Sequence, residues 1–333
     1  MGLSAAYALS QTRHKITLYD PKGVPANNAS SMAGGMLAPY AEIEHMPQAF
    51  IEAGLEGIKI WQNIMPDQIR QNGSLLIAHD EDRYILERFK QHLPPEKQIS
   101  VEPLEPQLPK KFTSMLHLKE EAHLDPAPTL SKLCDMLKDK GCIFQSSTYA
   151  PAHQNDYDYV IDCRGMGAAQ DDPDLRGVKG EILIVQNKEF SLSRPVRLMH
   201  PRYPLYIVPR EDNIFMIGAT NIESAGDGVS LRSGLELMSA LYSLHPSFGE
   251  AQIIDMKAGI RPAYPDNFPR ITIEDNVIRC NGLFRHGFLL APVMAECVTD
   301  YTENRHNKFT DLFWRDNNDP DHQRSEKDLR NAA

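Results

Sequence analysis

The sequence predicts an α/β fold, and three observations indicate it. Residues 1–11 have the small and apolar composition of a helix, and the β-type run KITLYD that follows ends on an acid, Asp20. Further along, the β-type runs PLYIVPR and NIFMIGAT are separated only by Glu211 and Asp212, which is typical of an antiparallel hairpin. The length of 333 residues suffices for one large domain or for two medium ones, each with a hydrophobic core.

The other elements follow from hydrophobic spacing and from the residues that interrupt it. Helices are expected at residues 49–65, 80–93, 126–140 and 231–244. Residues 24–42 are rich in small residues and predict a loop, whereas the run YDYVIDCRG predicts a buried strand that ends in a turn at Gly165. Residues 276–304 predict a strand, a loop and a long helix. The tail, residues 315–333, is too polar to bury much surface, and we expect it to be disordered.

Composition excludes several classes of protein. The formal net charge of −10 argues against a general nucleic-acid binder. No apolar run approaches the roughly 18–20 residues that span a membrane, and the charged and apolar regions of a signal peptide are missing, so we expect a cytoplasmic protein. The five cysteines are scattered and form no CxxC, which favours reduced thiols: Cys134, Cys142, Cys163, Cys280 and Cys297.

Two groups of side chains resemble metal ligands only superficially. His117 and His123 lie in HLKEEAHLD, and Glu42, Glu44 and His45 lie in AEIEHM. Neither group pairs histidines at helical i, i+4 spacing or completes a set of ligands. We therefore expect solvated side chains at both places, and no metal.

The first twenty residues have the spacing of a dinucleotide-binding βαβ unit. Such units place Gly-x-Gly-x-x-Gly between the first strand and the first helix, and an acid about 20 residues on binds the ribose hydroxyls. Here Gly2 precedes the helix, and Asp20 follows the next strand 18 residues later. We expect the first strand and the first two glycines of the motif to precede Met1. On this segment alone, an amphipathic helix and a strand without a ligand remain the alternative.

Five motifs occur in an order that is more specific than any one of them. They are ASSMAGGMLAP (residues 29–39), VIDCRGMGA (160–168), YIVPREDNIFMIGATN (206–221), AGIRPAYPDNFPRI (258–271) and NGLFRHGFLLAP (281–292). This order resembles the D-amino-acid oxidase superfamily of FAD-dependent oxidoreductases, and within it most of all the glycine oxidases of bacterial thiamine biosynthesis. The resemblance extends from Gly2 to Tyr301.

The resemblance implies a Rossmann-like FAD-binding domain that is interleaved with an antiparallel-sheet substrate domain. We expect the FAD-binding domain to comprise residues 1–68, 120–170 and 259–314. The substrate domain would comprise residues 69–119 and 171–258, and the hairpin at Leu205–Ala219 would face the flavin.

FAD suits the residues of these motifs. Gly34 and Gly35 offer backbone that can approach the flavin ring without interference from a Cβ, and Ala29 to Ser31 could donate hydrogen bonds to the diphosphate. The helix that follows HGFLLAP directs its free N–H groups toward negative charge on the N1–C2=O edge of the ring. The full expected set of cofactor-binding residues is Gly2, Asp20, Pro21, Ala29, Ser30, Ser31, Gly34, Gly35, Met36, Gly165, Leu283, Phe284, Arg285, His286, Gly287, Phe288 and Leu289.

Three residues are implied in substrate binding. Arg261 matches the family's carboxylate-binding arginine, Tyr206 a tyrosine that assists it, and Arg285 a second active-site arginine. A guanidinium suits a carboxylate because it can bind both oxygens at once. The alternative for either arginine alone is a surface charge or a salt bridge. Pro204 and Asn221 depart from some relatives, which carry histidine and methionine there, so the breadth of substrates stays open.

The implied reaction is the oxidative deamination of glycine, or of a small amino acid or amine, by hydride transfer to the flavin. It needs no side-chain acid or base, so no catalytic residue is assigned, and it gives an imine and, with O2, H2O2. The imine would be the dehydroglycine that supplies the thiazole of thiamine. We further expect a homo-oligomer that has the thiazole synthase machinery as a partner and binds neither nucleic acid nor a membrane.

Several alternatives remain at this point. The protein could act on sarcosine or on a D-amino acid, as an oxidase or a dehydrogenase. It could also be an inactive apo protein with a binding role, because the first part of the dinucleotide motif is not in the sequence. A nicotinamide dehydrogenase is less favoured, because the carboxyl-terminal flavin motif has no place in one.

Overall fold

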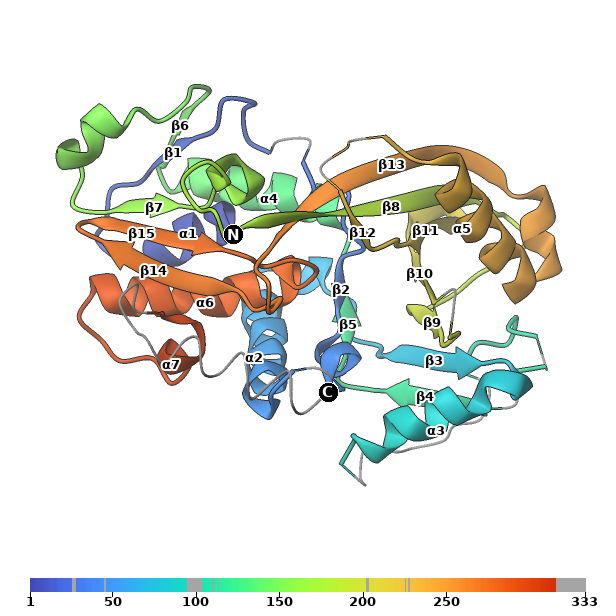
Figure 1. Cartoon of the computed structure of the whole chain (residues 1–333). Coiled ribbons are helices and arrows are strands. Elements are labelled where there is room, and N and C mark those ends of the chain that lie inside the picture. Colours follow the sequence, from blue (N-terminus) through green and yellow to red (C-terminus); the bar gives the residue numbers. More distant parts are fainter. Residues whose placement is uncertain are drawn as a thin grey trace. The chain divides into compact units, whose positions relative to one another are not determined.

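The computed structural model describes residues 1–25, 28–44, 46–94, 104–109, 111–112, 114–201, 204–224, 226 and 228–315. The chain divides into two compact units, each built from separate segments (Figure 1). Unit 1 comprises Met1–Ala26, Leu133–Val178 and Arg261–Ala333, and unit 2 comprises Asn27–Lys132 and Lys179–Ile260. The assignment of FAD-binding and substrate domains stays a prediction, because compactness alone does not say which ligand a unit binds. The expected disorder of the tail lies, from residue 316 on, outside the described residues.

Unit 1 consists of helices and small sheets. Its elements are α1 (Gly2–Leu9), β1 (Thr17–Tyr19), β6 (Ile143–Gln145), β7 (Val160–Asp162), β14 (Arg270–Glu274), β15 (Val277–Asn281), α6 (Gly287–Thr302) and α7 (Thr310–Phe313). Strands β1 and β6 pair in parallel, and β15 lies between β14, which is antiparallel to it, and β7, which is parallel. Helix α1 packs against α6 and β7, and its buried residues include Ala5 and Ala6, whose small side chains permit a close approach.

Unit 2 is dominated by a sheet whose strands follow the order β12-β8-β11-β10-β9-β3-β4, with β13 also paired to β8. Its elements are β2 (Met36–Leu37), α2 (Gln48–Ile64), β3 (Ser74–Ala78), α3 (Arg83–Gln91), β4 (Ser114–Leu118), β5 (Ala122–His123), β9 (Val196–Leu198), β10 (Leu205–Pro209), β11 (Ile214–Gly218), β12 (Ile222–Glu223) and α5 (Leu231–Leu244). Strands β2 and β5 form a separate antiparallel pair. Three elements contain residues of both units: α4 (Pro126–Asp139), β8 (Arg176–Gln186) and β13 (Gln252–Ala263).

Short 3-10 helices connect these elements. They are η1 (Pro39–Glu42), η2 (Pro66–Gln68), η3 (Asp80–Asp82), η5 (Pro151–Asp156), η6 (Gly165–Ala168), η7 (Glu211–Asn213) and η8 (Pro246–Glu250).

The core of unit 2 lies on both faces of the sheet because successive side chains of a strand point in opposite directions. In β3, Leu75 and Ile77 belong to a cluster that includes Leu237 and Leu241 of α5. Leu76 of the same strand belongs to a second cluster, with residues of α3. All five residues of β3 are buried, and for this reason the four residues after Ser74 are all apolar instead of alternating with polar ones.

The structure confirms the predicted α/β class and most of its elements. Strands β10 and β11 form the expected antiparallel hairpin, in which Tyr206 lies opposite Gly218. The helices predicted from hydrophobic spacing appear as α1 to α6, with ends that differ by a few residues. The sequence did not predict β3, β4, β8 or β13, although these strands form much of the main sheet.

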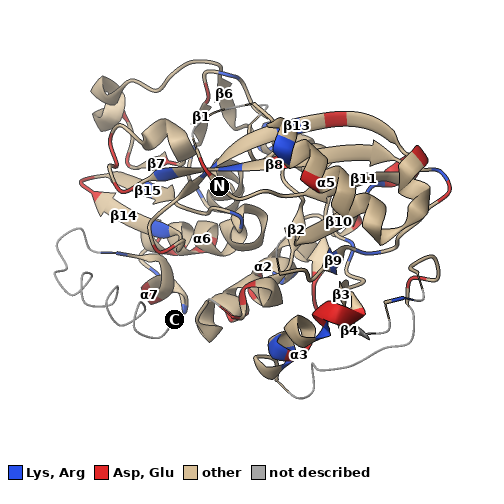
Figure 2. Ribbon diagram, turned by 45° about the vertical axis from the view of Figure 1, so that its right-hand side comes forward, with Lys and Arg blue, Asp and Glu red and all other residues tan. Residues whose placement is uncertain are grey.

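Charge is mixed along the chain. Figure 2 shows acidic and basic residues interspersed on the described ribbon. Helix α3, for example, contains Arg83, Glu87 and Arg88. Among the described residues, no helix combines the length and the apolar character that crossing a membrane requires.

Candidate flavin and substrate site

The predicted ribose-binding acid lies at the end of β1 in unit 1. The backbone N–H of Asp20 donates to the carbonyl of Gln145 at 3.1 Å and so continues the β1–β6 pairing. Its carboxylate Oδ1 accepts the N–H of Lys22 at 2.8 Å, which fixes the side chain over the turn. A methyl group at Gly2 would lie 3.5 Å from Cβ of Cys163, which is an ordinary contact. The packing of α1 therefore does not by itself demand glycine at its start.

The loop before α6 is fixed by backbone contacts to the end of β13. Phe284 has a φ of +46°, and its N–H donates to the carbonyl of Pro262 at 2.9 Å. At Gly282, where φ is +74°, an added Cβ would lie 2.2 Å from the ring of Tyr264. Only glycine fits there, both for its conformation and for the space available.

This loop brings the two predicted arginines to one aromatic ring. The Cζ of Arg261 lies 5.1 Å from the ring centroid of Phe284, and the Cζ of Arg285 lies 5.4 Å from it. Both distances suit cation–π contacts. Arg261 also donates through Nε to the carbonyl of Val178 at 3.3 Å. Two guanidinium groups on one ring give unit 1 a concentrated positive charge that suits a carboxylate.

The first turn of α6 is open for an anion or an electron-rich edge. His286, in the N-cap position, is buried, whereas a Cβ at Gly287 would meet no described atom within 4 Å. The N–H groups of Gly287 to Leu289 belong to the first turn, which lacks intrahelical acceptors. This end of the helix therefore fits the role that the flavin N1–C2=O edge requires. Gly165 lies nearby in the same unit, since its carbonyl accepts from Asn281 at 3.0 Å.

In unit 2 the glycine pair lies against the hairpin that carries Tyr206. A Cβ at Gly34 would lie 2.8 Å from Cε of Met216 and 3.2 Å from the ring of Tyr206. A Cβ at Gly35, where φ is +68°, would lie 2.1 Å from the carbonyl oxygen of Leu124. The structure thus brings the predicted flavin loop together with the predicted substrate tyrosine. No larger residue fits at Gly35, whereas a Cβ at Gly34 would require the end of the Met216 side chain and the ring of Tyr206 to move.

The predicted diphosphate loop is organised by a residue that the sequence analysis missed. Oδ1 of Asn28 accepts the N–H of Ser30 at 3.0 Å and that of Ser31 at 3.4 Å, and the Ser31 hydroxyl donates to the Asn28 carbonyl at 2.8 Å. An asparagine that bonds to the backbone two residues on is a known turn signal, so the sequence did contain a hint. Ala29 of this loop packs against β13, because a Cβ at Gly259 would lie 3.3 Å from its Cα.

The expectation of solvated side chains was wrong for two of the metal-like residues. His123 is 1% exposed, because β5 is paired with β2 on one side and bridged to Arg70 on the other, and Glu42 is also buried. Burial, together with the charges of Arg210 and Arg70, lowers the pKa of His123 to about 3. Neither ring nitrogen of His123 has a hydrogen-bond partner among the described residues.

The other metal-like residues are of two kinds. His117 belongs to the network described below, whereas His45 lies outside the described residues. Within the described ranges, no three His, Cys, Asp or Glu side chains gather as metal ligands.

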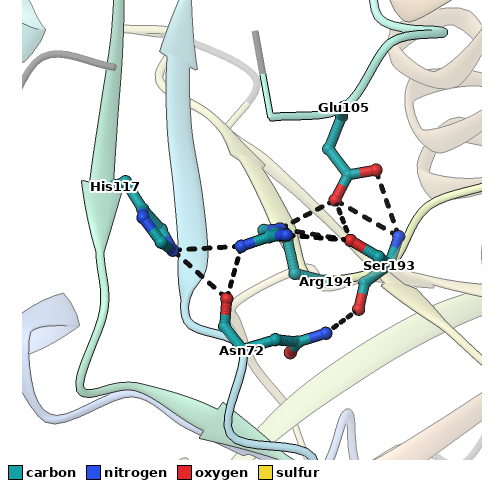
Figure 3. Close-up of polar contacts among 5 residues, drawn as sticks. All are labelled: Asn72, Glu105, His117, Ser193 and Arg194. Atoms are coloured by element: carbon teal, nitrogen blue, oxygen red, sulfur yellow. Dashed lines mark hydrogen bonds and ion pairs between the residues drawn. The ribbon is translucent and has the colours of Figure 1, made fainter. Parts of the chain in front are cut away.

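His117 belongs to a polar network around Arg194 (Figure 3). Arg194 donates through Nε to buried Glu105 at 2.8 Å and through Nη1 to the carbonyl of Asn72 at 2.6 Å. Glu105 also accepts the N–H of Ser193, and His117 Nε2 lies 3.2 Å from Nη1 of Arg194. The network ties the segment before β4 to the start of β9 and to the turn before β3, so it supports the sheet and contains none of the predicted ligand residues.

Three comparisons relate the chain to known proteins. Residues 1–301 match the family described as DAO, FAD dependent oxidoreductase. The putative thiamine biosynthesis oxidoreductase ThiO of Rhizobium etli is 42% identical over 304 residues, which cover 88% of this chain and 91% of that protein. The glycine oxidase of Bacillus licheniformis is 25% identical over 336 residues, which cover 90% of this chain and 89% of that protein. The crystal structure of glycine oxidase from Geobacillus kaustophilus shares the fold, with a TM-score of 0.80 at 19% identity over 92% of this chain and 93% of that one.

Proposed function

Because this chain belongs to the DAO family of FAD-dependent oxidoreductases, we propose that it oxidises glycine, or a similarly small amino acid or amine, to the imine. The names of its relatives support this choice, since they are a putative thiamine biosynthesis oxidoreductase and a glycine oxidase. The observation that carries the proposal is the pair of arginines on the ring of Phe284.

The residues present fit FAD. The open first turn of α6 offers N–H groups to the flavin edge, and the absence of a side chain at Gly34 and Gly35 leaves that loop room beside its neighbours. Asp20 at the end of β1 suits the ribose hydroxyls. When bound, FAD would supply the two-electron acceptor for the substrate hydride, with O2 as the final oxidant and H2O2 as its product.

The chain's own residues bind and orient the substrate. Arg261 holds the α-carboxylate, because a planar guanidinium can donate to both oxygens. Arg285 adds positive charge, and the hydroxyl of Tyr206 donates a further hydrogen bond. The substrate amine enters neutral, so no side chain needs to remove a proton, and the protein contributes position and electrostatics.

The imine would then be the dehydroglycine that supplies the thiazole of thiamine. The name of the Rhizobium etli relative supports a thiamine role. We extend the proposal to a cytoplasmic homo-oligomer that works with the thiazole synthase machinery, because a free imine hydrolyses readily and must be used close to where it forms.

The test is substitution of Arg261 in the FAD-loaded enzyme, with glycine, sarcosine and D-alanine as substrates and peroxide as the product measured. Arg261→Ala should lower kcat/KM for glycine by about 30-fold to several thousand-fold, since one partner of a desolvated charge pair is lost. Arg261→Lys should also be impaired, because an ammonium cannot replace the planar fork.

Arg279→Ala provides the control in the same unit, because Arg279 pairs with Glu274 at the surface. A loss of less than about threefold in Arg261→Ala with normal flavin content would remove Arg261 from the site and favour Arg285. Absence of peroxide with all three substrates in the flavin-loaded wild type would reject the proposed function.

A further inference from the structure

We propose that Arg210 is a positioning residue for the flavin reaction: it holds the Gly34–Gly35 loop in place through two backbone carbonyls. This inference rests on the proposed function, since it assumes that this loop lies against the flavin. Arg210 follows β10 directly, and Tyr206 lies four residues before it in the chain. The residue thus connects the hairpin to the loop.

The guanidinium of Arg210 bonds to two segments that are far apart in the chain. Nη2 donates to the carbonyl of Gly34 at 2.7 Å, and Nη1 donates to the carbonyl of Leu124 at 3.0 Å. The N–H of Leu124 in turn donates to the carbonyl of Gly35 at 2.9 Å. These bonds join the glycine pair, the end of β5 and the hairpin into one hydrogen-bonded group.

The surroundings of Arg210 are those of a fixed cation. Its side chain is only 11% exposed, and its Nε lies 3.6 Å from Oδ2 of Asp125. Burial lowers the pKa of Arg210, and the charge of Asp125 opposes this effect. A buried cation without acceptors is strongly unfavourable, so the two carbonyls and the carboxylate are needed to hold it. The same requirement fixes where those carbonyls lie.

The glycine loop needs such an anchor because Gly34 and Gly35 have no side chains that could hold the loop in one conformation. Gly34 and Gly35 lose more conformational freedom on ordering than any other residue would, and Gly35 adopts a φ of +68°. A loop that is displaced by about 1 Å would misplace the ring that it supports, which can reduce a rate by two orders of magnitude.

Arginine is required in place of lysine by the geometry of the contacts. Separate nitrogens of one planar group reach the carbonyls of Gly34 and Leu124. The single ammonium of a lysine has no rigid fork and would serve one carbonyl well at most. The proposal therefore predicts that Arg210→Lys is impaired, although it keeps the charge.

The test compares Arg210→Met and Arg210→Lys with the wild type as FAD-loaded full chains. We expect the rate of flavin reduction by saturating glycine to fall by about tenfold to 100-fold in Arg210→Met, and by less in Arg210→Lys. KM for glycine should change by less than about threefold, because Arg261 is untouched. The flavin absorption band of Arg210→Met should shift relative to the wild type. Free guanidinium at low millimolar concentration should partly restore the rate of flavin reduction in this variant.

Arg70→Met is the matched control. The backbone of Arg70 is bridged to that of His123, and its half-exposed side chain pairs with the exposed Glu211. Among the described residues, Arg70 makes no hydrogen bond to the glycine loop. The substitution Arg70→Met should leave the flavin absorption band and the rate of flavin reduction unchanged.

The outcomes separate the two proposals. Wild-type reduction rate and flavin band in Arg210→Met would overturn the positioning role. If Arg210→Met does not fold, Arg210→Lys decides: a wild-type reduction rate and a wild-type flavin band in that variant would overturn the positioning role. If the wild type itself is not reduced by glycine while the flavin band shifts in Arg210→Met, the proposed function fails and the positioning of the loop stands.

Discussion

A buried ion pair in unit 2 allows a sharp prediction on stability. Nζ of Lys179 lies 2.8 Å from Oε1 of Glu181, and their side chains are 10% and 0% exposed. Lys179 also donates to the carbonyl of Gly228 at 2.8 Å, while Glu181 accepts the N–H of Ser230 at 2.9 Å. The pair therefore ties β8 to the segment that follows the hairpin.

Lys179→Met should destabilise the protein strongly. Removing one partner of a buried pair costs roughly 3–5 kcal/mol, because the other charge stays buried. Glu181 keeps the bond from Ser230 and a 3.3 Å contact with the Thr220 hydroxyl, so we expect about 3 kcal/mol, near the lower end of that range. The double variant Lys179→Met/Glu181→Leu should recover most of this loss, because apolar residues of similar size often replace a buried pair at little cost.

The pH dependence gives the prediction its sign. Burial acts to raise the pKa of Glu181, but the ammonium of Lys179 and the bonds from serine outweigh burial, and the pKa is lowered overall. In the wild type the carboxylate thus contributes stability above its usual pKa of 4.5, and this contribution is lost as the pH falls through the lowered value. In Lys179→Met, burial should raise the pKa of Glu181 above 4.5. The variant should therefore lose stability as the pH rises, because the buried carboxylate then ionises without a partner. The difference in the free energy of unfolding between wild type and Lys179→Met should therefore increase from pH 5 to pH 8.

The assay is urea unfolding followed by tryptophan fluorescence. In a Trp314→Phe background the buried Trp61 of α2 reports on unit 2, because the chain has 2 tryptophans. Arg279→Met serves as the control and should change the free energy of unfolding by less than about 0.5 kcal/mol, since the partner of Arg279 is largely exposed. A gap that is equal at pH 5 and pH 8, or a double variant less stable than Lys179→Met, would refute the reasoning.

Four further outcomes are expected. Gly35→Ala should lower the flavin content and destabilise the fold by more than about 3 kcal/mol. Gly141→Ala has a similar positive φ but no described atom within 4 Å of the added Cβ, and should cost only about 1–2 kcal/mol in thermal unfolding. His123→Leu should raise the free energy of unfolding, and its advantage over the wild type should grow by up to about 1.4 kcal/mol for each pH unit below pH 6.5. The reason is that the buried histidine of the folded wild type stays unprotonated down to about pH 3, whereas the unfolded chain is protonated below pH 6.5. Identical acid unfolding of the two proteins would contradict this. Tyr206→Phe should reduce kcat/KM for glycine by about threefold to tenfold at unchanged flavin content, and an unaltered value would remove the hydroxyl from substrate binding.

Local signals predicted the elements that local spacing controls. The hairpin at Glu211 and Asp212 and the helix after Gly287 follow from residue patterns within about fifteen positions, and both are present. The motif order also indicated Arg261 and Arg285, which the structure brings to one ring. By contrast, β3 has a fully buried apolar run, whose periodicity cannot distinguish a strand from a buried helix.

Long-range contacts explain what the sequence did not reveal. Arg210 resembles an exposed charge beside a hairpin turn until Gly34 and Leu124 are brought to it from distant positions. His123 lies in a polar stretch, and its burial follows only from the pairing of β5 with β2. In both cases the sheet pairing decides the environment, and no local spacing encodes that pairing.

The proposed chemistry explains why backbone geometry carries so much of the site. A hydride transfer without a side-chain acid or base leaves position and electrostatics as the protein's means of lowering the barrier. Gly282 in unit 1, packed against the ring of Tyr264, and Gly35 in unit 2, packed against the carbonyl of Leu124, are two backbone positions that tolerate little change. Substitutions at Arg261 should then act mainly on the use of carboxylate substrates, whereas substitutions at Arg210 should act mainly on the flavin. If both arginines instead changed the same kinetic constant to the same extent for every substrate, this separation of roles would be wrong.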